Sequence, residues 1–317
     1  MADWRFETAA VIGTGMMGPG IALTLALGGV KTVIVSRSED GAAEGLARAR
    51  SQLLVLEQNG LAGPTTASAV AGLLSASADF DSAIAAAGLV IESAPEDMRF
   101  KQELFARMDA IAGPGAALAT NTSGLSVTSI AAHCKRPERV ITTHFWNPPH
   151  LMPLVEIVRG DRTDPSLAEA LKSLLRACGK SPVIVKRDTP GQLGNRLQMA
   201  LVREAIHIVE SGIAGVEEVD LAARRGFGLR LPAYGIFEHQ DAVGLDMALG
   251  ILNYVSQDLY NAPRAPQLMH DMVARGELGA KSGKGFYDWS EKSIDEVRAR
   301  RDRFVLDMLK RERGGPA

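Results

Sequence analysis

The stretch from Thr8 to Arg37, TAAVIGTGMMGPGIALTLALGGVKTVIVSR, decides the fold. Two short apolar runs, 9–12 and 31–35, are typical of buried parallel strands. Between them, three glycines have the G-x-G-x-x-G spacing of a phosphate-binding turn: Gly13, Gly15 and Gly18. A helix that begins at such a turn offers free N–H groups and the positive end of its dipole to a pyrophosphate. The stretch therefore predicts a strand–turn–helix–strand unit that binds a dinucleotide.

The same stretch has a competing interpretation as a membrane span. No charged residue occurs from Thr8 to Val30, and that length could cross a bilayer. Six glycines and Pro19 interrupt the stretch, and no basic segment precedes it as in a signal peptide. We therefore expect no membrane segment here.

Composition is typical of a globular enzyme. The chain has 317 residues, of which 46% are hydrophobic and 23% charged, and this length favours two domains. A net charge of −2 gives no indication of a nucleic-acid or membrane-surface partner. Cys134 and Cys178 have neither CxxC nor metal-ligand spacing, so we expect reduced thiols, no metal site and a cytoplasmic location.

Apolar runs alternate with helical patterns as far as residue 188. Further strands are predicted at 88–93, 116–120, 140–144, 154–158 and 182–186. The segments predicted to be largely helical are 41–87, 97–111, 126–133 and 166–178. This alternation predicts an α/β fold with a doubly wound, mainly parallel sheet.

The pattern changes after Asp188. Pro190 and Gly191 break the chain, and no convincing strand follows. The later helical patterns cover 195–211, 216–225, 242–259 and a charged segment, 291–313, with one apolar stripe. We place a domain boundary near residue 188, with a dinucleotide-binding domain at 1–188 and a helical domain at 189–317.

Six separated segments resemble the 3-hydroxyacyl-CoA dehydrogenase family, and they occur in the family's order. They are VIGTGMMGPGIA, ESAPED, NTSGL, RPERVITTHFWNPPHLMPLVEIV, DTPGQLGNR and GAKSGKGFYDW. The resemblance implies a Rossmann-like NAD(P)-binding domain, a helical C-terminal domain that forms a homodimer, and a cleft site between the domains. It also implies hydride transfer between a secondary hydroxyl group and a nicotinamide.

Such a reaction needs a base for the hydroxyl proton, and histidine suits this role near neutral pH. His144 ends a predicted strand, at the edge where α/β sheets bind ligands. Glu156 lies in the next strand, beyond the Asn147-Pro148-Pro149 turn, which could fold that strand back. A buried carboxylate needs a partner. A histidine before a turn is commonly only structural, but the buried carboxylate and the family resemblance together predict a His144–Glu156 pair in which the carboxylate fixes the tautomer of the base.

Other site residues depend on the resemblance. Ser123 and Asn195 match family residues that contact the substrate, although helix capping is their common alternative role. Glu96 and Lys101 match residues near the cofactor, with a first-turn acid and a solvated lysine as the alternatives. The expected cofactor contacts are Gly13, Gly15, Met16, Met17, Gly18, Ser36, Arg37, Glu96, Lys101 and Asn121.

The end of the second predicted strand departs from the family pattern. NAD enzymes usually have Asp or Glu there to bind the ribose hydroxyls, whereas this chain has Ser36 and Arg37. Arg37 could pair with a 2′-phosphate, although Glu39 and Asp40 would oppose one. Both NAD and NADP stay open as cofactors, and Ser36-Arg37 slightly favours NADP.

The substrate also stays open. Family members that bind CoA tend to have a lysine-rich helical hairpin after the second strand, but segment 41–80 has no lysine. NTSGL and the Asn-Pro-Pro turn resemble branches that act on free acids: L-gulonate 3-dehydrogenase (lambda-crystallin), L-carnitine dehydrogenase and a pyridine-carboxylate dehydrogenase. SGKGFYDW resembles the acyl-CoA enzymes. The alternatives are an acyl-CoA substrate, a free hydroxy acid, or a non-catalytic crystallin-like role, and His144, Glu156, Ser123 and Asn195 together favour an enzyme.

Overall fold

The computed structural model describes residues 4–63 and 66–313. Contacts divide the chain into two compact units. Residues up to Asn195, together with those from Arg300 onward, form the first unit, and Arg196–Ala299 form the second. The domain boundary near residue 188 itself stays a prediction.

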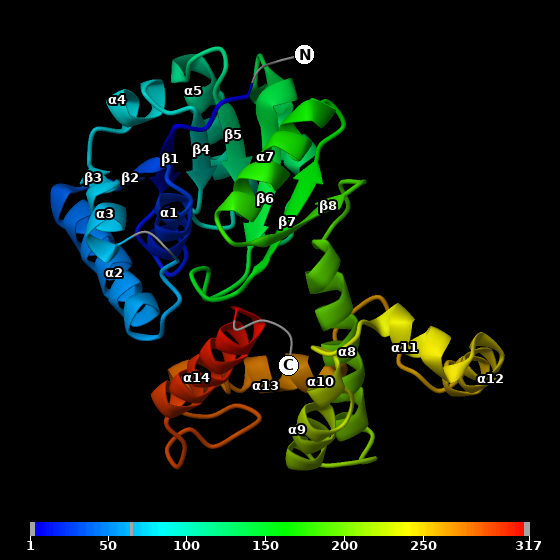
Figure 1. Ribbon diagram of the computed structural model, residues 1–317. Helices are drawn as coiled ribbons and strands as arrows, with labels where there is room; N and C mark the ends of the chain where they lie inside the picture. Colours follow the sequence, from blue (N-terminus) through cyan, green and yellow to red (C-terminus); the bar gives the residue numbers. More distant parts are fainter. Residues whose placement is uncertain (1–3, 64–65, 314–317) are drawn as a thin grey trace. The chain divides into compact units, whose positions relative to one another are not determined.

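The first unit is built on one eight-stranded sheet (Figure 1). The strand order is β3-β2-β1-β4-β5-β6-β7-β8, and every neighbouring pair is parallel except the antiparallel pair β6–β7. The strands are β1 (Thr8–Ile12), β2 (Lys31–Val35), β3 (Leu74–Ser77), β4 (Leu89–Glu92), β5 (Ala117–Thr120), β6 (Val140–Phe145), β7 (Leu154–Arg159) and β8 (Ser181–Val185). The predicted doubly wound, mainly parallel sheet is confirmed.

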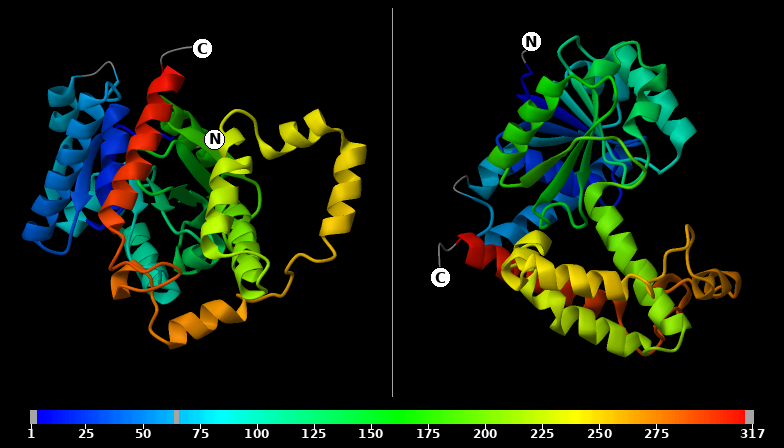
Figure 2. Two further views of the ribbon diagram at one scale, coloured as in Figure 1. Left: turned by 90° about the horizontal axis from the view of Figure 1, so that it is seen from below. Right: turned by 90° about the vertical axis from the view of Figure 1, so that its right-hand side faces the viewer.

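Helices cover both faces of this sheet and bury a hydrophobic core on each (Figure 2). They are α1 (Gly18–Leu27), α2 (Glu39–Gln58), α3 (Ala67–Gly72), α4 (Phe80–Ala85), α5 (Met98–Ile111), α6 (Val127–Ile130) and α7 (Pro165–Ala177), with short 3-10 helices η1 (Ala131–His133) and η2 (Pro137–Arg139). The core under α1, α2, α3 and α7 contains Leu89 and Ile91, whereas the core under α4, α5 and α6 contains Val90. This alternation follows from the two-residue period of a strand, and it explains why β4 is apolar on both faces.

Side-chain caps determine where most of these helices begin. In six helices the residue before the first turn accepts a hydrogen bond from a backbone N–H two or three positions further along. The caps are Ser38, Thr66, Asp79, Asp97, Ser126 and Asp164. Helix α1 differs, because Met17 at its N-cap makes no side-chain cap hydrogen bond. The N-terminus of α1 therefore keeps backbone donors for another partner.

Strand β3 corrects the sequence prediction, in which 41–87 is largely helical. Leu74–Ser77 add a parallel edge strand to β2. The run LSAS has one large apolar residue, Leu74, and small side chains after it, so its pattern carries no strand signal. The open edge of β2, rather than local preference, makes this segment a strand.

The second unit is helical. Helix α8 (Leu193–Glu210) enters it from the first unit. The helices that follow are α9 (Val216–Arg225), α10 (Phe227–Arg230), α11 (Ile236–Val243), α12 (Leu245–Val255), α13 (Gln267–Ala274) and the 3-10 helix η3 (Ala280–Ser282). The continuous helix predicted at 242–259 is wrong, because Gly244 adopts a φ of 101° and separates α11 from α12.

Helix α14 (Ile294–Arg313) returns the chain to the first unit. Leu306 is buried in the core beside α1 and α7, and Val305 and Leu309 pack against that core. The predicted apolar stripe of this charged segment is therefore confirmed. Among the described residues, no helix has both the length and the apolar content that crossing a membrane requires.

Candidate active site at the carboxyl edge of the sheet

The glycine-rich turn lies between β1 and α1. Gly13 has a φ of 109°, and a Cβ atom there would collide with the carbonyl oxygen of Ser93. A Cβ atom on Gly18 would collide with the backbone of Gly13, so this glycine lets α1 begin directly against the end of β1. A Cβ atom on Gly15 would meet no atom within 4 Å, which leaves open space above the turn. This space and the uncapped N-terminus of α1 fit the pyrophosphate of a dinucleotide.

The residues after the turn and after β2 are accessible. Met16 is 67% exposed, and Met17 is half-buried at the N-cap of α1. Ser36 donates its backbone N–H to the carbonyl oxygen of Ser77 at 3.1 Å. Arg37 is exposed, and within 4–63 and 66–313 its guanidinium has no hydrogen-bond or ion-pair partner. The two residues that bear on cofactor choice are therefore free to meet a ligand at the edge of the sheet.

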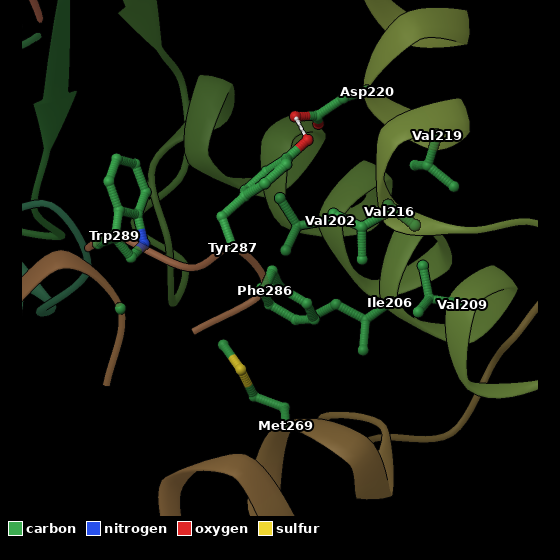
Figure 3. Close-up of a pocket in the computed structure, with 12 residues that line it drawn as sticks. Val202, Ile206, Val209, Val216, Val219, Asp220, Met269, Phe286, Tyr287 and Trp289 are labelled. Carbon is green, nitrogen blue, oxygen red and sulfur yellow. Dashed lines mark hydrogen bonds between the residues drawn. The ribbon is translucent and has the colours of Figure 1, made fainter. Parts of the chain in front are cut away.

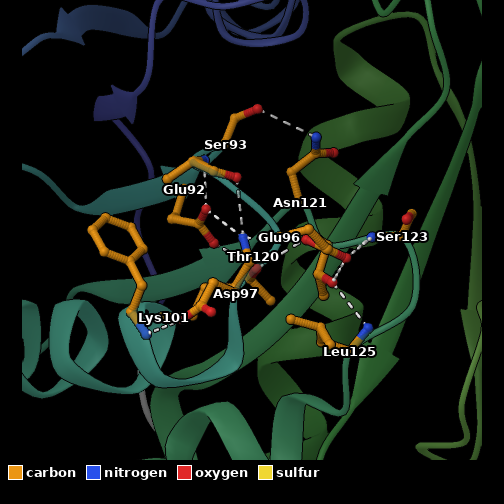
Figure 4. Close-up of polar contacts among 12 residues, drawn as sticks. Glu92, Ser93, Glu96, Asp97, Lys101, Thr120, Asn121, Ser123 and Leu125 are labelled. Carbon is orange, nitrogen blue, oxygen red and sulfur yellow. Dashed lines mark hydrogen bonds and ion pairs between the residues drawn. The ribbon is translucent and has the colours of Figure 1, made fainter.

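A buried ion pair lies beneath the segment that follows β4 (Figure 4). Glu92 is fully buried at the end of β4, and its Oε1 is 2.6 Å from Nζ of Lys101 on α5. The hydroxyl of Thr120 donates to Glu92 Oε2 at 2.7 Å. Lys101 is 1% exposed, so the alternative of a solvated lysine is wrong. Glu92 is missing from the sequence-predicted site, although a single carboxylate in the apolar run GLVIES carries the same signal as Glu156.

Glu96 joins this pair to the loop after β5. Its Oε1 accepts hydrogen bonds from the Thr122 hydroxyl and from the backbone N–H of Ser123, the latter at 3.1 Å (Figure 4). Its Oε2 is 3.5 Å from Lys101 Nζ. Asp97, not Glu96, caps α5, so the alternative of a first-turn acid is wrong for Glu96.

Asn121 connects the ends of three neighbouring strands. Its Oδ1 accepts the backbone N–H of Phe145 in β6 at 2.8 Å, and its Nδ2 is 3.5 Å from the Ser93 hydroxyl after β4. Figure 4 shows its side-chain amide directed toward Ser93. Asn121 thereby fixes the spacing of the strand ends at which the predicted cofactor and base residues lie.

His144 and Glu156 form the predicted pair. The Asn147-Pro148-Pro149 turn folds β7 back antiparallel to β6, and the register places His144 directly opposite Glu156. His144 Nδ1 is 2.7 Å from Glu156 Oε2, with His144 6% exposed and Glu156 fully buried. The carboxylate therefore holds Nδ1 as the protonated nitrogen and leaves Nε2 with a free lone pair.

His150, in the loop that joins β6 to β7, differs from His144 at the end of β6. Burial, with the nearby positive charge of Lys180, lowers the pKa of His150 to about 4. Its Nδ1 is buried and has no hydrogen-bond partner among the described residues. Of these two histidines, His144 is the one that a carboxylate orients for proton transfer.

Ser123 and Asn195 meet at the start of α8. The Asn195 amide donates to the backbone carbonyl of Ser123 at 2.8 Å, and the neighbouring Gly194 N–H donates to Glu156 Oε1. Ser126 caps α6, and Asn195 lies inside α8, so the alternative of helix capping is wrong for both residues. The first turn of α8 thus joins Ser123 to the His144–Glu156 pair.

The predicted residues therefore form two groups. One continuous set of contacts runs from Glu92 and Lys101 through Glu96, Ser123 and Asn195 to the turn of α8 that holds Glu156. Ser36 and Arg37 lie apart from it, after β2, with the glycine turn after β1 between them and β4 in the sheet order. This spacing suits an extended dinucleotide that lies along the carboxyl ends of several strands.

The second unit has an apolar cavity of its own, which the sequence did not predict (Figure 3). Its volume is about 330 Å³, and it lies between α8, α9, α13 and segment 279–289. The Tyr287 hydroxyl donates to Asp220 at 2.8 Å at one end, and most of the remaining wall is aliphatic or aromatic. The cavity has no cluster of ionisable groups suited to catalysis.

Two family profiles match almost the whole chain. The NAD-binding domain of 3-hydroxyacyl-CoA dehydrogenase matches residues 8–189, and the C-terminal domain of 3-hydroxyacyl-CoA dehydrogenase matches residues 191–289.

Individual relatives come from two branches. A 5-formyl-3-hydroxy-2-methylpyridine 4-carboxylate 5-dehydrogenase of Mesorhizobium japonicum is 34% identical over 94% of this chain and 95% of its own. A crystal structure of an enzyme of that name, described as an NAD⁺-dependent dismutase, aligns with a TM-score of 0.90 at 30% identity, over 96% of this chain and 98% of its own. The crystal structure of (S)-3-hydroxybutyryl-CoA dehydrogenase from Ralstonia eutropha aligns with a TM-score of 0.74 at 32% identity, over 90% of this chain and 99% of its own.

Proposed function

The chain belongs to the 3-hydroxyacyl-CoA dehydrogenase family, whose members are NAD-dependent oxidoreductases acting on CH–OH groups, and from this premise we propose that its substrate is a small carboxylic acid without CoA. The observation that carries the proposal is the charge of α2. Its only basic residues are Arg48 and Arg50, and Arg48 is paired with Glu44 at 3.3 Å. Acidic residues Glu39 and Asp40 occupy its first turn. This helix offers little attraction to the several phosphate charges of CoA.

The comparisons support the same choice. The pyridine-carboxylate enzyme aligns with a TM-score of 0.90, against 0.74 for the Ralstonia hydroxybutyryl-CoA enzyme. By its name, the first acts on a small ring with carboxylate, hydroxyl and formyl groups. A substrate of this class has no adenosine phosphates and needs no basic cluster on α2.

His144 is the proposed base. Since Glu156 holds Nδ1–H, the lone pair on Nε2 takes the proton of the substrate hydroxyl while the carbon beneath that hydroxyl loses its hydride. NAD, when bound, accepts the hydride. The hydroxyl group of Ser123 and the second amide hydrogen of Asn195 hold the substrate oxygen as its charge changes. Glu156 stabilises the imidazolium that forms.

A further part of the proposal concerns whether the protein also accepts NADP. NAD is the cofactor of the matching domain family, and acceptance of NADP is proposed from Ser36 and Arg37. Support comes from the exposed Arg37 guanidinium and from the absence of an acidic side chain at position 36, which would repel a 2′-phosphate.

The proposed assembly is a homodimer formed through the helical unit. Of the described hydrophobic residues in 196–299, only Ile206 and Met272 are buried, whereas Phe237 and Tyr254 are 85% and 80% exposed. Neither α11 nor α12 has a buried residue. The cavity in Figure 3 adds a further apolar surface. So much exposed apolar surface supports association with a second copy, for which two-fold symmetry is the commonest arrangement.

A cytoplasmic location also stays part of the proposal. Cys134 and Cys178 are free and buried, and burial raises the pKa of each thiol to about 11. Such thiols are mostly protonated and unreactive at neutral pH, which agrees with reduced cysteines in a structural role.

Steady-state kinetics tests the substrate proposal. The absorbance of the reduced nicotinamide is followed with acetoacetyl-CoA and NADH, with free 3-hydroxy acids and NAD, and with 5-formyl-3-hydroxy-2-methylpyridine-4-carboxylate and NAD, where the hydrate of the formyl group supplies the hydroxyl proton and the hydride. We expect the highest kcat/KM for an acid without CoA. A 3-hydroxyacyl-CoA is the second candidate, favoured by the 32% identity with the Ralstonia enzyme, and a higher kcat/KM for acetoacetyl-CoA would establish it instead.

A further inference from the structure

The carboxylate of Glu156 is held at both oxygens. Oε2 accepts the Nδ1–H of His144, and Oε1 accepts the backbone N–H of Gly194 at 2.5 Å. Gly194 lies in the first turn of α8, where backbone N–H groups have no partner within the helix and the helix dipole is positive. A fully buried carboxylate is thus held between the base and the start of the helix that carries Asn195.

The fit at Gly194 is tight. A Cβ atom there would lie 2.5 Å from Cζ2 of Trp146 and 3.2 Å from Glu156 Oε1. Trp146 follows β6, and its ring centroid is 5.7 Å from that of His144. Its indole therefore fills the space between the base and the first turn of α8. Any larger side chain at position 194 must displace the indole or the helix turn.

Backbone conformation does not require a glycine here. Gly194 is helical, and its φ is not positive. Glycine also favours the helical conformation less than alanine does. The close contact with Trp146 therefore explains why residue 194 has no Cβ atom.

We propose that Gly194 positions the Glu156 carboxylate through its N–H, and that the indole of Trp146 restricts position 194 to glycine. The proposal rests on the proposed role of His144 as the base. It makes Gly194 and Trp146 positioning residues: they act on the reaction through Glu156 and Asn195, and neither is assigned a contact with the substrate.

Gly194→Ala tests the steric part. We expect kcat to fall by about 100-fold, the scale for a displacement of about 1 Å in a catalytic group, with little change in the KM for NAD. Trp146→Phe replaces the bicyclic indole with a smaller phenyl ring, which lacks the outer indole atoms such as Cζ2 that a Cβ at position 194 would meet. Added to Gly194→Ala, it should restore most of the lost kcat, since two residues in contact do not act additively. Gly72→Ala in α3 is the matched control, because a Cβ there meets no atom within 4 Å.

A second pair of variants tests the hydrogen bond. Gly194→Pro in the Trp146→Phe background removes the N–H, whereas Gly194→Ala in that background keeps it. Proline is tolerated in the first turn of a helix but also restricts the backbone of the preceding residue, Leu193, so thermal unfolding of both double variants is measured beside kcat to separate loss of the donor from loss of the helix turn. The alanine variant should be active and the proline variant impaired. This comparison decides the matter even if Gly194→Ala alone does not fold.

A readout without substrate separates this proposal from the proposed function. The Nδ1–H···Oε2 bond of the free wild-type protein should give a downfield proton resonance in its NMR spectrum, lost in Gly194→Ala and regained with Trp146→Phe. If no probe is turned over but this resonance behaves as stated, the proposed function fails and the positioning stands. Wild-type kcat in Gly194→Ala, no rescue by Trp146→Phe, or equal activity of the two double variants would overturn the positioning.

Discussion

Two glutamate carboxylates are buried in the sheet, and each accepts hydrogen bonds from neighbouring groups. Glu92 has Lys101 and Thr120, and Glu156 has His144 and Gly194. An unpaired charge at such a place would cost several kcal/mol, so the fold keeps these carboxylates only together with their partners. The Glu92–Lys101 pair supports the edge of the sheet where we propose that the cofactor binds. The His144–Glu156 pair is the proposed proton-transfer pair.

Breaking the first pair should destabilise the protein. Lys101→Met leaves Glu92 buried without its cation, and we expect the free energy of unfolding to fall by about 3–5 kcal/mol in urea titrations. Adding Glu92→Gln should recover part of that loss. The control is Arg107→Met, which breaks an exposed pair with Asp81 and should cost less than about 1 kcal/mol. A Lys101→Met loss no larger than that of the control would contradict the structural role.

We expect cofactor preference to depend on Ser36 and Arg37, the two residues after β2. Because a charge-assisted hydrogen bond contributes roughly 1.5–3 kcal/mol, Arg37→Ala should lower kcat/KM for NADP about tenfold to a hundredfold more than for NAD. Ser36→Asp should shift preference toward NAD by repelling the 2′-phosphate. If wild type prefers NAD and Arg37→Ala leaves the ratio unchanged, the NADP proposal is wrong.

At the level of residues, the sequence predicts contacts between side chains that are close together along the chain. His144 and Glu156 are joined by one short turn, so strand periodicity and the cost of a buried carboxylate, together with the family resemblance, predict the pair. The contact of Gly194 with Trp146 depends on where α8 meets the end of β6, which no local pattern specifies. The burial of Glu92 follows from the same reasoning as that of Glu156, because each is a single carboxylate in an apolar run.

Among the helices and strands, α2 bears most directly on whether the substrate is a CoA thioester. Calorimetry with acetoacetyl-CoA and NAD should give weak binding, because neither Arg48 nor Arg50 is part of a basic cluster. Glu44→Lys adds a positive charge to the helix and frees Arg48 from its partner, so it should raise the affinity and its dependence on salt. Tight, strongly salt-dependent binding by the wild type would show that basic groups elsewhere bind CoA.

Elements were predictable where the apolar pattern is strong. Runs such as those of β1, β4 and β7 are buried on both faces and were expected as strands. Strand β3 was not, because Leu74–Ser77 are held by pairing with β2 and have little apolar content. The helical pattern at 242–259 was real, but the left-handed φ of Gly244 divides it in a way that periodicity does not reveal.

In the whole molecule, the helical unit exposes an apolar surface that we propose a second copy covers. We expect light scattering at micromolar concentration to give a dimer, since exposed residues such as Phe237 and Tyr254 cannot be buried within the unit. Phe237→Asp together with Tyr254→Asp should shift the population toward monomer. Phe100→Asp on α5, also an exposed aromatic position, is the control. A wild-type monomer would refute this assembly.

The fold class followed from sequence because alternating strands and helices admit few arrangements. The homodimer and the domain boundary at 188 stay predictions. The assembly depends on a second chain, and a boundary depends on which contacts form across Pro190 and Gly191. The identity of the substrate depends on side chains that converge from separate elements. The composition of α2 indicates only how much charge a substrate can carry there.

We propose that the His144–Glu156 pair carries the proton transfer of an NAD-dependent dehydrogenase. Turnover of His144→Gln and Glu156→Gln tests this role, with NAD binding measured by calorimetry on the same samples. We expect His144→Gln to lower kcat by about 10²–10⁴-fold, Glu156→Gln also to impair it, and the Kd for NAD to stay close to wild type. Full activity in both variants would show that another group transfers the proton.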